Sequence, residues 1–442
     1  MLDLAKSDVL HVLQPILLSL QILGLWPKDG ETFLKKMNIL SRFIFFYMHF
    51  YALHNVINWL FTFHRDLGNS FLFPNRVTSR TIIGFYAFLE NASLVIRTVA
   101  TTATFDMFFN THHDTVASLV AIDLFPPLFM KTNLRNLRAY ILTLVAGSWI
   151  YVIIQLAFTA WTVATMDTQT FMNYYFYGFH TEHVNVAVMR FIMALVWFLY
   201  IAITLSGEIF LKTFYIATCL LLGRCARSYN MVVSDIDKQE IVSGEDINRL
   251  NKLHTQLCDL VIGVDKNFTN KAFIWVATIF LNICTKIGAI VVGSNASETS
   301  AAIMDIVNYV VIFLVFTLTA ADVSYQCEMT LPIAHRLASK ADMNDLTVLY
   351  QAKLMISKMG FGISRLTGWN CFVINRPFIV TVFSAILTYS VVLMQMNRTN
   401  EHSNHSRDFR YSNVSTLEMY NETTSNVTEI ENTYSMFNVT IQ

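Results

Sequence analysis

The stretch TYSVVLMQMNRTNEHSNHSRD, Thr388 to Asp408, begins as an apolar segment and ends as a polar one. Residues 397–442 hold eight asparagines, and six of them stand in Asn-X-Ser/Thr sequons: Asn397, Asn404, Asn413, Asn421, Asn426 and Asn438. N-glycosylation uses such sequons on surface segments of the secretory side. The stretch therefore predicts a last membrane span that ends outside the cell in a glycosylated, disordered tail. The alternative is a polar tail that is merely rich in Asn, Ser and Thr.

The composition is that of a membrane protein. Hydrophobic residues make up 54% of the 442 residues and charged residues 14%, whereas a soluble domain is about 25% charged. The 31 basic residues equal the 31 acidic ones, so no excess charge favours nucleic acid as a partner. Membrane lipid is the partner that this composition predicts.

Apolar segments long enough to cross a bilayer recur along the chain. Each span needs roughly 20 mostly apolar residues as a helix. The sequence predicts seven of them: 37–63, 81–103, 137–164, 186–222, 268–293, 301–321 and 372–396. The predicted fold class is therefore all-α, a seven-transmembrane helical membrane protein.

Lys and Arg residues set the predicted orientation. They gather before the first span and in the connections that follow the even-numbered spans, and the third-to-fourth and fifth-to-sixth connections have none. The positive-inside rule then puts the N-terminus in the cytosol and the C-terminus outside, in agreement with the sequons. The six cysteines all lie in predicted spans or cytosolic segments, so no extracellular disulfide is expected.

Two cytosolic segments have helical periodicity. Apolar residues recur at steps of three and four before the fifth span (Ile247, Leu250, Leu253, Leu257, Leu260, Val261, Val264 and Phe268) and before the seventh (Leu346, Leu349, Ile356, Met359 and Ile363). Such stripes indicate amphipathic helices. We expect them to form a cytosolic helical anchor bundle; helices lying on the membrane surface are the alternative.

These segments divide the chain into five regions. The predicted boundaries are a cytosolic N-terminal segment 1–36, six spans with a ligand-pocket region 37–322, an anchor region 323–371, a pore helix 372–396 and the tail 397–442.

The last span carries a family resemblance. Thr388-Tyr389, five residues and then Gln395 resembles the final-span signature of arthropod gustatory receptors, and Asn375-Arg376 resembles its lead-in. ILGLWP, Ile22 to Pro27, is similar to an N-terminal element of the related insect odorant receptors. The chain departs from the gustatory pattern at Met396, where Phe is usual, and in its long tail.

The resemblance implies a chemosensory, ligand-gated, non-selective cation channel. Such a channel is a tetramer whose final helices line a central pore, with a small-molecule ligand bound among helices 2 to 6. It implies no enzyme activity and no cofactor, a tastant as ligand, homo- or hetero-tetrameric assembly, and the plasma membrane of sensory neurons. An odorant receptor subunit that needs a co-receptor is the close alternative.

The residues themselves are compatible with a pore. On a helix, Thr388, Val391, Val392 and Gln395 share one face, and Tyr389 belongs to the signature that the resemblance carries over. An amide ring at the mouth with valines below suits hydrated ions and a gate that closes by dewetting. A packing face with one interfacial Gln is the alternative.

Charged residues inside spans five and six predict an ion pair. Lys286 and Asp305 lie at similar distances from the turn near Asn295, so antiparallel helices bring them to one depth. Charges at this depth need a partner or water. We expect a structural clamp, with ligand contact as the alternative; Glu90 and Arg97 of span two should face protein or water.

A pocket open to the outside could use aromatic and polar residues in the outer halves of the spans: Tyr86, Glu90, Gln155, Trp161, Phe191, Trp197, Asn308 and Tyr309. Aromatic walls with a few polar groups suit a small organic ligand. Core packing and the interfacial aromatic belt explain such residues equally well.

Other classes fit less well. THHDT, Thr111 to Thr115, lacks the spacing of zinc peptidases, so we expect a solvated loop and no metal site. A G-protein-coupled receptor would have its N-terminus outside, usually with N-terminal sequons and an extracellular disulfide. A transporter should show an internal repeat or broken helices, and the sequence shows neither.

Overall fold

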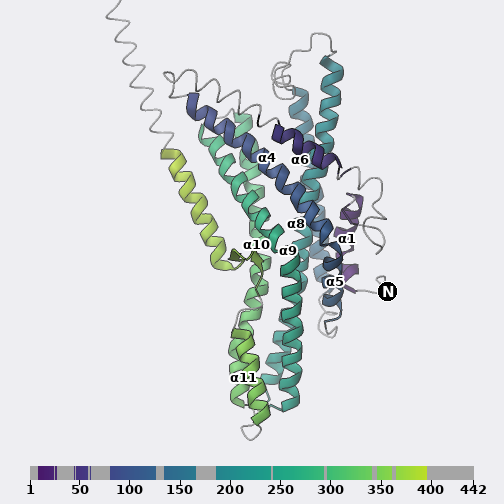
Figure 1. Cartoon of the computed structure of the whole chain (residues 1–442), viewed down its shortest axis with the longest axis vertical. Coiled ribbons are helices and arrows are strands. Elements are labelled where there is room, and N and C mark those ends of the chain that lie inside the picture. The colour runs from purple at the N-terminus through teal and green to yellow at the C-terminus, as the bar shows by residue number, and fades with distance from the viewer. Residues whose placement is uncertain are drawn as a thin grey trace, which may run out of the picture.

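A computed structural model of the full chain describes residues 8–23, 25–26, 44, 46–57, 60, 80–125, 134–165, 186–239, 242–292, 296–340, 346–360 and 365–395. Within these ranges the chain is a bundle of long helices, and its one sheet is a two-stranded hairpin. The molecule is elongated along the helix axes (Figure 1). The predicted all-α fold class is confirmed.

The helices run in chain order as α1 (Asp8–Ile22), α4 (Arg80–Asn110), α5 (His112–Asp123), α6 (Leu134–Thr165), α8 (Val186–Asp237), α9 (Gly244–Val292), α10 (Ala296–Lys340) and α11 (Leu346–Gly360). The strands β1 (Thr367–Gly368) and β2 (Phe372–Val373) pair antiparallel. A final helix follows at Arg376–Gln395.

Five of the described helices are long and apolar enough to cross a membrane: Arg135–Phe158, Ala202–Asp237, Gly244–Val291, Ala302–Lys340 and Arg376–Gln395. They match the predicted spans three to seven. Predicted span two is helical throughout within α4. Most of predicted span one lies outside the described residues, but 46–57 are helical.

Helix α8 is the centre of the packing. Its side chains are buried on all sides over much of its length, as expected for a helix that is apolar all round. Phe210, Phe214 and Tyr215 are at most 1% exposed, and the Tyr215 ring stacks on Phe316 of α10 at 4.7 Å between centroids. Helix α1 packs against α6 and α8 through an apolar face that includes Leu13, Ile16 and Leu20.

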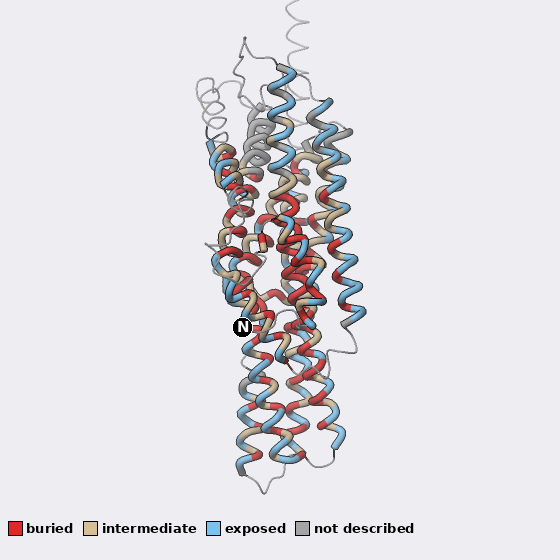
Figure 2. The backbone as a smooth tube through the Cα atoms, turned by 90° about the vertical axis from the view of Figure 1, so that its right-hand side faces the viewer, coloured by how far each residue is buried: buried red, intermediate tan, exposed pale blue. Residues whose placement is uncertain are grey.

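Helices α8, α9 and α10 run on past the apolar region into a narrower bundle with α11 (Figures 1 and 2). The predicted stripe of α9 is its buried face here, from Ile247 at 1% exposed to Phe268 at 2%. Ser243 is the N-cap of α9, because its hydroxyl accepts from the Asp246 backbone N–H (3.1 Å). The same hydroxyl donates to the Asp246 carboxylate (2.6 Å).

Two local predictions are wrong. The segment 111–115 is not a solvated loop but the junction of α4 and α5, where the His112 ring packs against Trp26 at 4.4 Å. The seventh span does not begin at Phe372, because Phe372 and Val373 form β2 and the helix begins at Arg376. Asn375 caps that helix by accepting from the Phe378 backbone N–H (3.0 Å).

Candidate functional site

A group of charged side chains lies between the membrane-spanning helices. The carboxylate of Glu208 on α8 accepts from two cations, Lys212 one turn along the same helix and Arg97 of α4. The Arg97 Nε to Glu208 Oε2 distance is 3.4 Å. Glu208 and Lys212 are 5% and 2% exposed. Buried charges of this kind persist only when each has a partner, so this trio ties α4 to α8.

A second ion pair lies between α9 and α10. Lys286 Nζ and Asp305 Oδ2 are 3.4 Å apart, so the structure brings together the two residues that antiparallel geometry predicts as a pair. Gln155 of α6 donates to the same Asp305 carboxylate (3.3 Å) and to the Tyr151 hydroxyl (3.2 Å). The pair therefore has polar contacts from a third helix.

Tyr309 connects the two ionic groups. It lies one helical turn from Asp305 on α10, and the Arg97 guanidinium sits 5.9 Å from its ring centroid. That distance is within the range of a cation–π contact. Five helices, α4, α6, α8, α9 and α10, thus contribute to one polar cluster inside an otherwise apolar bundle. Ser93 of α4 extends it by donating to Asn282 of α9 (3.3 Å).

The predicted ligand residues divide into three groups. Gln155 and Tyr309 belong to the cluster, and Asn308 is half-buried beside Tyr309. Trp161 and Phe191 are 69% and 71% exposed on the bundle surface, where they face away from any interior space. The side chains of Tyr86, Glu90 and Trp197 lie outside the part of the chain that the structure describes.

Glu208 and Lys212 are not among the site residues predicted from the sequence. Both stand inside the predicted fourth span, and their spacing of four residues puts them on one helix face. The rule that intramembrane charges need partners, which singled out Lys286 and Asp305, applies to them equally.

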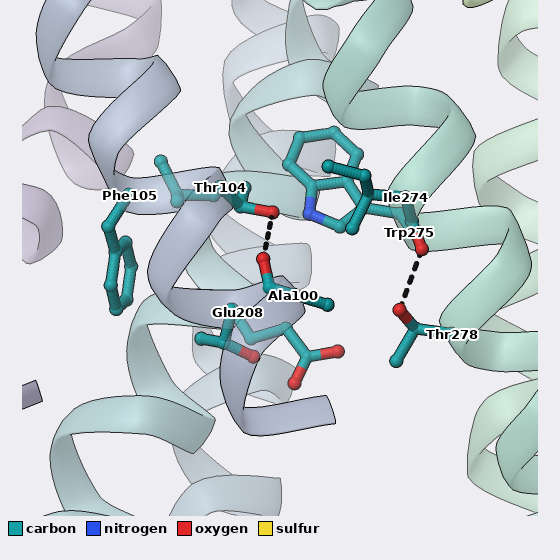
Figure 3. A pocket seen from close by; sticks show the side chains of 9 residues that line it. Ala100, Thr104, Phe105, Glu208, Ile274, Trp275 and Thr278 are labelled. Carbon is teal, nitrogen blue, oxygen red and sulfur yellow. Dashed lines mark hydrogen bonds between the residues drawn. The ribbon is translucent and has the colours of Figure 1, made fainter. Parts of the chain in front are cut away.

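A small cavity lies next to this cluster, between α4, α8 and α9 (Figure 3). Its volume is about 10 Å³, and its lining includes Glu208 and Trp275. It is far smaller than a site for an organic ligand, which takes about 300–1,000 Å³. This cavity is therefore not the site of an organic ligand.

The hairpin before the final helix is attached to α9. The Asp265 carboxylate accepts from the backbone N–H of Thr367 (2.6 Å) and from its hydroxyl (2.9 Å). One turn further along α9, the backbone carbonyl of Thr269 accepts from the Trp369 N–H (2.9 Å). One turn beyond, Phe273 packs edge-on against the Trp369 ring at 5.2 Å.

The turn of this hairpin has an uncommon backbone. Trp369 and Asn370 have φ of 49° and 55°, as in a type I′ turn, which normally prefers Asn and Gly. A left-handed Trp is held there by its ring contact with Phe273 and by its N–H bond to α9. The hairpin is thus a connection of defined backbone conformation that is bonded to α9 and leads into the final helix.

The predicted pore residues lie on the open side of the final helix. Thr388, Val391, Val392 and Gln395 are exposed in the single chain, and Tyr389 is half-buried. Leu393, on another face, is 4% exposed. The helix is anchored at its start, where the Arg376 guanidinium lies 4.2 Å from the Tyr325 ring centroid of α10.

No family model and no curated protein matches this sequence. Among solved structures, the insect olfactory receptor OR5 from Machilis hrabei superposes with a TM-score of 0.65 at 12% identity, covering 88% of this chain and 99% of that one. The chain has the fold of an insect olfactory receptor. The structure of that receptor in complex with eugenol is also similar, with a TM-score of 0.61, 13% identity and the same coverage.

The similarity to OR5 extends over nearly the whole of both chains. It therefore concerns the helical architecture as a whole. With five described helices suited to crossing a bilayer, a chain of the OR5 fold is a multi-pass membrane protein.

Proposed function

We propose that this protein is a gustatory-receptor-like, ligand-gated, non-selective cation channel of four subunits. Two features support this. The chain shares its fold with the receptor OR5, and the gustatory signature Thr388-Tyr389 with Gln395 stands on the final helix of that fold. Cations would pass along this helix in each subunit, in a homo- or hetero-tetramer.

The observation that carries the proposal is the exposure of the final helix. Only 11% of its most apolar stretch is buried within the chain, against 89% for the stretch in α8. Val380 and Leu387 are each 66% exposed, and Val391 and Val392 45%. A helix with one open face can pack against its copies around a central axis, with Thr388, Tyr389, Val391, Val392 and Gln395 toward the pore.

In this proposal the channel opens because its ligand binds the open state more tightly than the closed state. A ligand that binds the open arrangement of α4, α6, α8, α9 and α10 better than the closed one shifts the population toward open. The polar cluster supplies charged and aromatic groups for a small organic ligand, together with the predicted residues Tyr86, Glu90 and Trp197. Trp161 and Phe191, which face outward in the single chain, are not part of this interior site. The hairpin on Asp265 would carry a movement of α9 to the final helix.

The proposed placement is the plasma membrane of sensory neurons. The N-terminus and the lower bundle would lie in the cytosol, and the six sequons of residues 397–442 would lie outside and carry sugars. Lys286 and Asp305 would act as a structural clamp between α9 and α10 rather than as ligand contacts.

An odorant receptor subunit is the second candidate. The similarity to OR5 favours it, since OR5 is an olfactory receptor. The two candidates differ in a measurable way, because a subunit that needs a co-receptor would conduct only when that second chain is present.

Whole-cell current from cells that express this chain alone tests the proposal. Sugars and bitter compounds, applied as a panel with G-protein signalling blocked, should evoke a cation current. Gln395→Ala should change the relative permeability of cations, whereas the matched Gln351→Ala on α11 should not. A current that G-protein block abolishes, or an unchanged selectivity in Gln395→Ala, would contradict a pore at the final helix.

A further inference from the structure

The small cavity between α4, α8 and α9 has polar groups on every side. Thr101 and Thr104 come from α4, Glu208 from α8, and Trp275 and Thr278 from α9. Figure 3 shows these helices converging on one space. At about 10 Å³ the space admits the centre of a single water molecule and nothing larger.

One hydrogen-bond donor at this cavity is unpaired. Trp275 is 2% exposed, and its Nε1–H has no hydrogen-bond partner among the residues that the structure describes. Indole has no acceptor and only this one donor. Buried donors without a partner are rare unless an ordered water accepts from them. The Trp275 N–H therefore needs an acceptor in the cavity, and no described protein atom is placed to be that acceptor.

Acceptors for a water are present on the other walls. The hydroxyls of Thr101, Thr104 and Thr278 already donate to the carbonyl oxygens four residues earlier, at 2.8, 2.7 and 2.7 Å. Because the hydroxyl hydrogens are used in these bonds, the three hydroxyls can only accept a hydrogen bond from a molecule in the cavity. A carboxylate offers about four lone-pair directions, and Glu208 uses its oxygens for Lys212 and Arg97.

We propose that this cavity is a binding site for one water molecule. The water accepts from Trp275 Nε1–H and donates to the Glu208 carboxylate and to a threonine hydroxyl. In this way it connects Trp275 of α9 to the cations Arg97 and Lys212 through Glu208. The inference does not depend on the proposed function.

The chemistry of the walls selects water over an ion. A cation would meet the Trp275 N–H dipole and a carboxylate that two cations already neutralise. An anion would meet the negative charge of Glu208. Water alone can both accept from the indole and donate to the oxygens.

Paired threonine substitutions test the proposal on the purified full chain. Thr104→Val with Thr278→Val removes two acceptors at the cavity while keeping the side-chain shape. The matched control is Thr102→Val with Thr218→Val, since those buried hydroxyls make the same bonds to carbonyls at 2.9 Å but do not line the cavity. We expect the cavity pair to lower Tm by about 1 to 3 °C more than the control pair.

A double-mutant cycle then asks whether Trp275 shares the water. In a Trp275→Phe background the difference between the two threonine pairs should disappear, because the donor that fixes the water is gone. Equal effects of the two pairs in the native background would overturn the proposal. So would a difference that persists unchanged with Phe at position 275.

A density map that resolves ordered waters gives an independent answer. We expect a single peak between Trp275 Nε1 and the Glu208 carboxylate. A map that shows the neighbouring side chains and waters but no peak in the cavity would overturn the proposal whatever the stability data show.

Discussion

Glu208 holds two cations inside the bundle, and its loss should be costly. In Glu208→Gln the ammonium of Lys212, whose side chain is 3% exposed, remains buried without a counter-charge. Breaking a buried pair from one side costs about 3–5 kcal/mol. We therefore expect a large fall in the thermal unfolding midpoint of the purified protein and a smaller folded yield.

The control is an exposed pair with the same substitution. Glu328 binds Arg365 at 3.2 Å with both side chains more than 40% exposed, so Glu328→Gln should cost less than about 1 kcal/mol. Glu208→Leu combined with Lys212→Met should recover part of the loss. Equal midpoints for Glu208→Gln and Glu328→Gln would show that the trio does not hold α4 to α8.

His112 should make the stability of the protein depend on pH. Burial among Trp26 and Phe108 lowers the pKa of His112 from 6.5 to about 4, with a smaller contribution from His113. Between those values the unfolded chain binds a proton that the folded chain does not, so stability falls as pH drops from about 6.5 to 4. The slope from this one group is at most about 1.4 kcal/mol per pH unit.

His112→Gln should flatten this slope in thermal unfolding measured from pH 7 to 4. The adjacent His113 is exposed, so His113→Gln is the matched control and should leave the slope nearly unchanged. Curves that stay parallel for the wild type and His112→Gln would mean that His112 is not buried in its neutral form.

The sequence predicts part of the polar cluster, and the reason is geometric. Lys286 and Asp305 flank a short turn, so antiparallel pairing alone fixes their relative depth. Arg97 could not be assigned to Glu208, because the two residues are 111 positions apart in the sequence and no short connection sets the register of α4 against α8. Which charged residues become partners in such cases depends on how distant helices pack, and the local helix propensity of the sequence does not determine this.

Periodicity predicts the helices well and their ends poorly. The apolar patterns find every described span, but α8 and α10 continue for several turns beyond the predicted spans into the lower bundle. The continuation of α9 was predicted, because its apolar stripe begins at Ile247. The hairpin β1–β2 was not predicted, because Phe372 and Val373 belong to a continuous apolar run that was assigned to the seventh span. Asn375 followed by Arg376-Pro377 was the available signal, since Asn is a preferred N-cap and Pro suits the first turn.

The attachment of this hairpin to α9 should depend on Asp265. Asp265→Ala removes the acceptor of two Thr367 donors. A hydrogen bond to a charged group contributes about 1.5–3 kcal/mol. Deuterium uptake by the backbone amides of 366–374 should therefore speed up about tenfold or more, since local opening governs exchange there.

Asp259→Ala, at an exposed position on the same helix, is the matched control and should leave the uptake of 366–374 unchanged. Thr367→Ser keeps both donors to Asp265 and should restore wild-type protection. If deuterium uptake does not change in Asp265→Ala, then Asp265 does not hold the hairpin on α9, and the contacts of Thr269 and Phe273 alone do so.

The orientation of the whole chain in the membrane is a prediction from the sequence. The distribution of Lys and Arg and the sequons are independent signals, and both predict the C-terminus outside. The shared fold with OR5 explains why a chain with little sequence similarity still has this arrangement of long helices. Orientation is therefore the property that a single biochemical measurement can decide for the entire molecule.

We expect glycosidase treatment of the protein from expressing cells to increase its gel mobility. Replacing the six sequon asparagines of residues 397–442 one after another by Gln should remove the shift in up to six steps, because each site carries its own glycan. Asn400→Gln and Asn432→Gln are the matched controls, since both lie in the same segment outside any sequon. A protein without any shift would place these residues on the cytosolic side, reverse the orientation of every span, and make a G-protein-coupled receptor the better hypothesis.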